Sequence, residues 1–83
     1  MSFELEFDEK AIEFLDKLPK ELKKRIFDKI IQAKENPFHY FERLAERAEY
    51  RLRVGDYRII ADIDSLKIQI RYIGHRKNVY EKY

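Results

Sequence analysis

The segment 50–60 constrains the fold more than any other part of the chain. It reads Tyr-Arg-Leu-Arg-Val-Gly-Asp-Tyr-Arg-Ile-Ile, so that Gly55-Asp56 lies between two runs in which apolar and charged residues alternate. Such a pattern predicts a β-hairpin that is closed by a two-residue turn. The chain is therefore expected to contain an antiparallel sheet built around this turn.

The length of the turn fixes which residues of this hairpin share a face. The predicted pairs are Val54 with Tyr57, Arg53 with Arg58, Leu52 with Ile59 and Arg51 with Ile60. Because strand side chains alternate between faces, the apolar residues face the core, and Arg51, Arg53 and Arg58 gather on the other side. Like charges directly opposite each other cost up to about 1 kcal/mol per pair. We therefore expect an anionic partner to bind this face at least part of the time.

A second turn is predicted at Asp64-Ser65, followed by a last strand that ends near Ile73 because Gly74 breaks it. The predicted pairs are Ile63 with Leu66, Asp62 with Lys67, Ala61 with Ile68, Ile59 with Ile70 and Arg58 with Arg71. This register extends the basic residues into a row of Arg53, Arg58 and Arg71 across three strands. Gly74 also allows the chain to turn sharply, so His75, Arg76 and Tyr80 can fold back toward the arginines.

The N-terminal half predicts one strand and two helices. Residues 2–7 alternate as a half-buried strand, and Asp8 is a helix cap. Helices are expected over 9–18 and about 19–35, with Pro19 in the first turn of the second. The basic run of the second helix is either a solvated surface or a secondary phosphate contact. Residues 38–47 indicate only a short helical turn that crosses to the sheet.

Together these elements predict one α+β domain over residues 1–83. It has an N-terminal strand, a two-helix hairpin and a three-stranded antiparallel meander, which form one small sheet with helices on one face. The 83 residues leave little room for an internal substrate cavity. Cys is absent, and two His without an acidic cluster predict no metal site. No cofactor is expected, and no membrane span or signal peptide, which indicates a soluble cytoplasmic protein.

Positive charge is concentrated in the C-terminal half. Residues 1–46 contain nine Lys/Arg and eleven Asp/Glu, whereas residues 47–83 contain nine Lys/Arg and five Asp/Glu. The net charge of the second part is thus positive although that of the whole chain is only +2. This distribution favours a polyanion as partner of the sheet.

The arginine face could support metal-free cleavage of RNA. That reaction needs a base for the 2′-hydroxyl, positive groups at the phosphate and an acid for the leaving 5′-oxygen. Arg suits the phosphate because its fork matches the oxygens and stays protonated. His75 is a candidate proton shuttle, and Tyr80 could act as base if neighbouring Arg charges lowered its pKa. A solvated face, or a patch that binds an acidic protein, explains the same residues.

Three segments resemble one known family. The segment 50–60 and the later run Ile73-Gly-His-Arg-Lys-Asn-Val-Tyr80, together with Leu18-Pro-Lys-Glu-Leu22 in the helical hairpin, resemble the RelE/ParE superfamily of toxins from type II toxin–antitoxin systems, and RelE in particular. The resemblance spans nearly the whole chain. It implies a small α+β toxin that enters the ribosomal A site and cleaves mRNA there without a metal. It also implies a RelB-like cognate antitoxin that wraps the toxin in a hetero-oligomer.

The resemblance also implies roles for single residues. Arg51 and Arg53 match the basic pair that holds mRNA and 16S rRNA phosphates, with Arg71 and Lys77 as further RNA-binding candidates. Arg58 matches the arginine that stabilises the transition-state charge. Arg76 matches an arginine that acts on the leaving group or scissile phosphate. Tyr80 matches a tyrosine proposed as general base, and His75 stands at a position that other members fill with a basic residue or histidine.

Two other functions fit the same resemblance and composition. ParE-like members share the scaffold, lack the ribonuclease residues and inhibit DNA gyrase. A non-catalytic module that binds RNA or an acidic protein also fits the charge pattern. The presence of Arg58, Arg76 and Tyr80 together favours the mRNA endonuclease.

Overall fold

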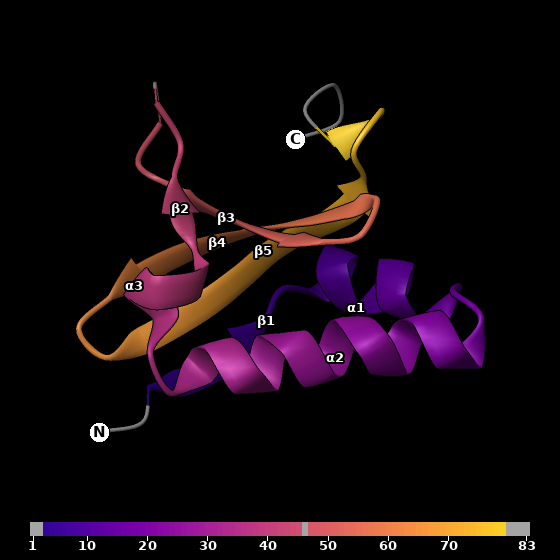
Figure 1. The fold of residues 1–83 in the computed structure, drawn as a ribbon, viewed down its shortest axis with the longest axis horizontal. Coiled ribbons are helices and arrows are strands. Elements are labelled where there is room, and N and C mark those ends of the chain that lie inside the picture. Colours follow the sequence, from indigo (N-terminus) through magenta and orange to yellow (C-terminus); the bar gives the residue numbers. More distant parts are fainter. Residues whose placement is uncertain (1–2, 46, 80–83) are drawn as a thin grey trace.

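The computed structural model describes residues 3–45 and 47–79. The elements in chain order are β1 (Glu4–Phe7), α1 (Glu9–Asp16), α2 (Lys20–Lys34), α3 (Pro37–Tyr40), β2 (Glu42–Arg43), β3 (Tyr50–Val54), β4 (Tyr57–Asp64) and β5 (Lys67–His75). In this part of the chain the strands form one sheet in the order β1-β5-β4-β3-β2 (Figure 1). The predicted α+β class is confirmed.

The helical hairpin carries the chain from one edge of the sheet to the other. β1 forms one edge and pairs in parallel with β5, whereas β2 forms the opposite edge and pairs antiparallel with β3. Between them in the chain, α1 and α2 cover one face of the sheet (Figure 1). The short helical turn expected within 38–47 is α3, and the two-residue strand β2 was not predicted.

The hydrophobic core lies between the helices and this face of the sheet. Its buried residues are Ala11, Leu15, Ile26, Ile30, Ala33, Phe41, Leu52, Val54, Ile59, Ala61, Ile68, Ile70 and Ile73. Ile12 of α1 and Phe27 of α2 are not among these core residues. Their side chains remain 46% and 44% exposed, because they lie at the border of the apolar stripe.

The first hairpin has the predicted register. Arg53 pairs with Arg58, and Leu52 pairs with Ile59. The turn residue Gly55 has φ +57°, a left-handed conformation that glycine adopts without the steric cost of a Cβ atom. The Gly55-Asp56 signal was therefore sufficient to place both strands.

The register predicted for the second hairpin is wrong. The turn is Ser65-Leu66, both with positive φ, and Asp64 pairs with Lys67. A β-bulge between Ile60 and Ala61 then brings Arg58 opposite Gly74. The turn lies one residue later than predicted, so residues 61–63 pair two positions further along β5 and keep their faces, and the apolar pattern fits both pairings there. Beyond the bulge, Ile59 and Arg58 pair three positions further along β5 than predicted.

The bulge also explains why β5 is longer than expected. Ile68 and Ile70 alternate on the core face, but Ile73 is an odd-numbered residue that strict alternation would place on the other face. The bulge restores Ile73 to the core, opposite Ile59. β5 therefore continues through Gly74 to His75 instead of ending at Ile73.

Asp8 occupies the predicted N-cap position of α1, but its side chain makes no capping hydrogen bond. Its carboxylate instead accepts hydrogen bonds from Gln69 Nε2 at 2.6 Å and from Arg71 Nε at 2.7 Å. Asp8 thus ties the start of the helical hairpin to the last strand.

Candidate nucleic-acid interface

The face of the sheet opposite the helices carries the arginines of β3 and β4. Arg53 is exposed and lies directly across from half-buried Arg58. The side chains of these two residues point to the side that α1 and α2 leave open, which we call the arginine face. The placement confirms the like-charge pair that the hairpin pattern predicted.

The turn between β3 and β4 holds the guanidinium group of Arg58. Arg58 Nη1 donates hydrogen bonds to the carbonyl oxygens of Gly55 and Tyr57, each at 2.9 Å. Two carbonyl dipoles therefore face the positive charge and offset part of its repulsion with Arg53. Only one Nη atom takes part in these bonds, so the guanidinium group still offers N–H donors to an anion.

Arg76 is attached to the same turn. Its backbone N–H donates to the carbonyl oxygen of Asp56 at 2.7 Å. The side chain approaches the Asp56 carboxylate, with 3.6 Å between Nε and Oδ1. One β-turn therefore brings together Arg58 from β4 and Arg76 from the segment after β5, although 17 positions separate them in the sequence.

The segment after β5 returns over the arginine face. Val79 is fully buried although it does not belong to the main core. A Cβ atom built on Gly74 would lie 3.3 Å from Val79 Cβ and 3.0 Å from Tyr72 Cε2. Because Gly74 pairs with Arg58, Val79 is seated on the sheet beside this arginine. Tyr80 follows directly in sequence and lies outside the described residues.

His75 contacts the end of the first hairpin. Its ring lies edge-on to Tyr57, with 5.4 Å between ring centroids, and Tyr57 in turn contacts Phe14 of α1. His75 Nδ1 accepts a hydrogen bond from the backbone N–H of Lys77 at 3.2 Å. Both contacts hold the ring against the hairpin and the C-terminal turn.

Arg71 does not lie where the sequence placed it. The row of Arg53, Arg58 and Arg71 is interrupted because Gly74 takes the position opposite Arg58. Arg71 instead forms ion pairs with Asp8 at 2.7 Å and Asp62 at 2.6 Å. The hydrogen bonds that Arg71 donates to Asp62 and Asp8 raise the pKa of Arg71 above its ordinary value. Its charge is already balanced within the sheet.

Arg51 is also paired. Its Nη2 atom lies 2.7 Å from Glu42 Oε2 of β2. The hydrogen bond from Arg51, followed by its charge, holds the pKa of the Glu42 carboxyl below its usual range. The described carboxylates therefore balance some of the predicted site residues less than others. The least balanced charges are those of Arg53, Arg58, Arg76 and the exposed Lys77.

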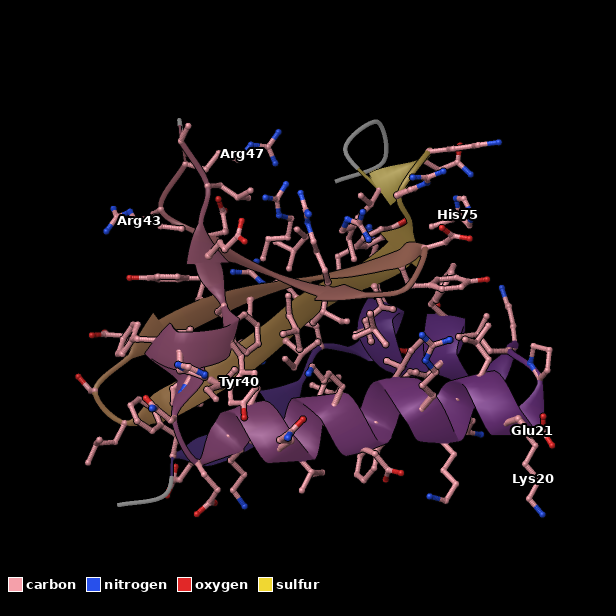
Figure 2. The ribbon with its side chains drawn as sticks, viewed as in Figure 1. Lys20, Glu21, Tyr40, Arg43, Arg47 and His75 are labelled. Carbon is pink, nitrogen blue, oxygen red and sulfur yellow. The ribbon has the colours of Figure 1, made fainter. Side chains whose placement is uncertain are left out.

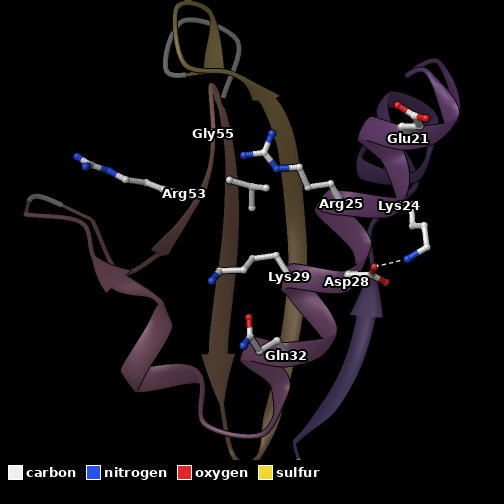
Figure 3. A pocket seen from close by; sticks show the side chains of 9 residues that line it. Glu21, Lys24, Arg25, Asp28, Lys29, Gln32, Arg53 and Gly55 are labelled. Carbon is white, nitrogen blue, oxygen red and sulfur yellow. Dashed lines mark hydrogen bonds and ion pairs between the residues drawn. The ribbon is translucent and has the colours of Figure 1, made fainter.

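The structure adds basic residues that sequence reasoning did not assign to the site. Arg47 lies in the loop after β2, on the side of the sheet away from the helices, whereas Arg43 of β2 lies over the ring of Tyr50, with 5.8 Å between its Cζ atom and the ring centroid (Figure 2). Arg25 and Lys29 of α2 line an open groove of about 820 Å³ with Arg53 and Gly55 (Figure 3). The basic run of α2 was the sequence signal that could have indicated Arg25 and Lys29 as site residues. In the structure, the groove lies between this run and the tip of the first hairpin.

The part of the chain that the structure describes contains neither a candidate metal site nor a candidate membrane-spanning helix. No group of three or more His, Cys, Asp or Glu side chains is arranged to hold a metal ion there. None of its helices is long and apolar enough to cross a membrane.

Solved structures share this fold. A chain of the toxin–antitoxin complex RelBE2 from Mycobacterium tuberculosis superposes with a TM-score of 0.83 at 21% identity, and the match covers 92% of this chain and 93% of that one. A chain of the archaeal RelE–RelB complex from Pyrococcus horikoshii gives a TM-score of 0.77 at 22% identity, over 92% and 97% of the two chains. A chain of the intact Escherichia coli RelBE complex gives 0.74 at 19%, over 89% and 96%.

The fold and the arginine face thus define a small α+β domain of the kind found in toxin–antitoxin complexes. The comparison with curated sequences gave no match. A family model described as the ParE toxin of the type II toxin–antitoxin system parDE matches residues 5–80. The chain belongs to this family, within the RelE/ParE superfamily that its motifs resemble.

Proposed function

We propose that this toxin is a metal-independent endonuclease that cleaves mRNA in the ribosomal A site and so arrests translation in the cytoplasm. The observation that carries the proposal is the attachment of Arg58 and Arg76 to one turn on the uncovered face of the sheet. The turn holds the guanidinium group of Arg58 through carbonyl oxygens and holds Arg76 through its backbone N–H. Two guanidinium groups that bind the non-bridging oxygens of one phosphate stabilise the charge that develops on it.

The reaction divides between these residues as follows. A base removes the proton of the 2′-hydroxyl, the 2′-oxygen attacks the adjacent phosphorus, and the bond to the 5′-oxygen breaks. The products are a 2′,3′-cyclic phosphate and a 5′-hydroxyl that has taken up a proton. We assign charge stabilisation to Arg58, contact with the scissile phosphate to Arg76, and the base to Tyr80. His75 is the second candidate for proton transfer.

Binding of the strand uses the remaining cations. Arg53 and Lys77 are exposed and flank Arg58 and Arg76, and Arg51 can contribute if a phosphate displaces Glu42. Arg71 requires the loss of two ion pairs before it can bind RNA, so we omit it from the proposed interface. The solved relatives are complexes of RelB with RelE, and we propose that an antitoxin likewise neutralises this chain.

A translation reaction programmed with one defined mRNA tests the nuclease directly. Added toxin should cleave the message within the A-site codon, in the presence of EDTA at a concentration that spares the ribosome. Intact message together with continued translation at equimolar toxin would exclude this function.

A second function is favoured by the family match. The matching family is that of ParE toxins, and the resemblance implies gyrase inhibition for members of that branch. DNA supercoiling by purified gyrase separates the two proposals. Inhibited supercoiling with intact mRNA would assign the chain to gyrase inhibition.

A further inference from the structure

The arginine face carries a carboxylate at the edge strand β2. Glu42 lies directly opposite Arg51 in the pairing of β2 with β3. Arg51 precedes Arg53 by two residues on β3, and strand side chains alternate between faces, so both arginines point to the same side of the sheet. Residues directly opposite each other in an antiparallel pair also share a face. The Glu42 side chain is therefore placed on the arginine face, beside a residue of the proposed RNA-binding site.

The contact between Glu42 and Arg51 is short and charged. Arg51 Nη2 lies 2.7 Å from Glu42 Oε2, a distance typical of a charge-assisted hydrogen bond. The hydrogen bond from Arg51, and then its charge, hold the pKa of the Glu42 carboxyl below its usual range, and the charge of Arg53 adds to this lowering. Glu42 is thus ionised at neutral pH and attracts two cations of the arginine face.

The two side chains of this pair differ in their exposure. The Glu42 side chain is 63% exposed, whereas that of Arg51 is only 23% exposed. Arg51 lies between β2 and β4, in the row where it pairs with Ile60. The arginine is therefore the more fixed member of the pair, and the carboxylate has room to turn toward solvent. Exposed ion pairs of this kind are weak enough to exchange one anion for another.

A carboxylate and a phosphate satisfy a guanidinium group in the same way. Both present oxygen atoms whose spacing matches the N–H donors of arginine. An RNA strand that runs from Arg53 toward β2 brings a phosphate close to Arg51, where Glu42 Oε2 already accepts a hydrogen bond. The two anions repel each other at this distance. A phosphate must therefore displace the carboxylate before Arg51 contributes to binding.

We propose that Glu42 is an intramolecular competitor for the RNA phosphate at Arg51 and limits how tightly the toxin holds a single strand. This inference rests on the proposed function, because it takes RNA as the ligand of the arginine face, but it does not require cleavage. At Arg58 the described residues place carbonyl oxygens, not a carboxylate, on the guanidinium group. The strand is thus bound firmly at the tip of the first hairpin and weakly at the β2 edge.

Binding of an RNA that the toxin cannot cleave tests this competition. The probe is a short single-stranded RNA with 2′-O-methyl groups throughout, and its Kd for the full-length toxin is measured at several salt concentrations. Glu42→Gln should lower the Kd about two- to fivefold, the effect of one exposed ion pair. The slope of log Kd against log salt should steepen by about 0.7, the value for one added phosphate contact on a single strand. An unchanged Kd and slope would overturn the proposal.

Glu13→Gln is the matched control for the change in net charge. Glu13 is an exposed residue of α1, which covers the opposite face of the sheet, so this variant should leave the salt slope unchanged. In an Arg51→Ala background, Glu42→Gln should lower the Kd no more than Glu13→Gln does. A gain that persists without Arg51 would show that Glu42 repels RNA in general, and the competition for this arginine would be refuted.

The toxin without any substitution provides a second measurement. Carboxyl NMR should show that the pKa of Glu42 rises when the 2′-O-methyl RNA binds, because the carboxylate then loses Arg51. RNA binding that leaves this pKa in place would contradict the displacement.

The competition and the nuclease can fail separately. Absence of A-site cleavage, with the gain in Glu42→Gln retained, would remove the nuclease alone. Cleavage together with equal Kd values for Glu42→Gln and Glu13→Gln would remove the competition alone. Failure of both the unsubstituted toxin and Glu42→Gln to bind the RNA would also reject the competition.

Discussion

Gly74 provides the space in which Val79 is buried. A methyl group at position 74 would lie 3.3 Å from Val79 Cβ and 3.4 Å from Val79 Cγ2. Gly74 has no positive φ that would require glycine. The glycine is therefore needed for close approach, and it lets the C-terminal segment rest on the strand residue opposite Arg58.

Gly74→Ala is expected to loosen this segment while the main core stays folded. The added methyl group also meets Tyr72 Cε2 at 3.0 Å, and overpacking of this kind costs about 1–3 kcal/mol. Exchange of the Arg76 amide, which is bonded to Asp56, should accelerate at least tenfold, while amides of Ile59 and Ile73 keep their relative protection. Unchanged exchange at Arg76 would show that the segment does not depend on this contact.

Arg58→Ala should lower the rate of mRNA cleavage, whereas Arg71→Ala should leave it almost unchanged. Loss of one positioned donor to a developing charge lowers catalysis by about 100- to 1000-fold, so Arg58→Ala should reduce mRNA cleavage to that extent and relieve growth arrest. Arg71→Ala should leave the cleavage rate within a few-fold. Rates of cleavage in a programmed translation reaction provide the measurement, and similar losses in both variants would contradict the separation of the two arginines.

The role of Arg71 in stability follows from its two ion pairs. Its side chain is 42% exposed, and those of Asp8 and Asp62 are 33% and 39% exposed, so solvent weakens both attractions. We expect Arg71→Ala to lower the free energy of unfolding by about 1 kcal/mol or less, measured by urea denaturation. Arg53→Ala is the control, because the described residues give Arg53 no ion pair, and it should not reduce stability.

The turn that holds Arg58 depends on Gly55. Its φ of +57° costs an L-residue about 1–2 kcal/mol, and a Cβ atom would also lie 3.3 Å from Arg25 Nη2. Gly55→Ala should destabilise the protein by about that amount, whereas Gly55→Asn should cost less because Asn tolerates this conformation. Thermal unfolding of the two variants tests the order, and equal melting temperatures would contradict it.

The Glu42–Arg51 pair predicts a pH dependence with a definite sign. Arg51 lowers the pKa of Glu42 from its ordinary 4.5. A lowered folded-state pKa stabilises the protein above the unfolded pKa, and this stabilisation is lost as the pH falls through the folded pKa. Carboxyl NMR should show a rise in the pKa of Glu42 in Arg51→Ala. Arg71→Ala should leave the titration of Glu42 in place.

The sequence was sufficient to place the first hairpin but not the second. Gly55-Asp56 fixed the turn, and the alternation around it admitted one assignment of faces. Around Ser65, the same apolar residues face the core in two registers that differ by two positions, and the bulge at Ile60 leaves no compositional signal. For this reason Arg71 was expected beside Arg58, whereas the structure pairs it with Asp8 and Asp62.

The sequence predicted which residues belong to the candidate site but not how they are arranged in space. Arg53 and Arg58 follow from the hairpin alone. Their relationship to Arg76 depends on a backbone hydrogen bond to Asp56, and therefore on how the segment after β5 returns to the sheet. Gly74 predicted that the chain could turn back there, but it did not specify the group that the returning segment contacts. The contributions of Arg25 and Lys29 likewise required the packing of α2 beside the hairpin tip.

The pairing of β1 with β5 has a consequence for biosynthesis. These are the first and last strands of the described chain, and β1 forms an edge that contacts no strand except β5. The partner of β1 is thus synthesised after every other described strand, and contacts between distant segments close slowly. The seat for Val79 on Gly74 belongs to the same strand, so a nascent toxin cannot assemble its arginine face before β5 has been synthesised.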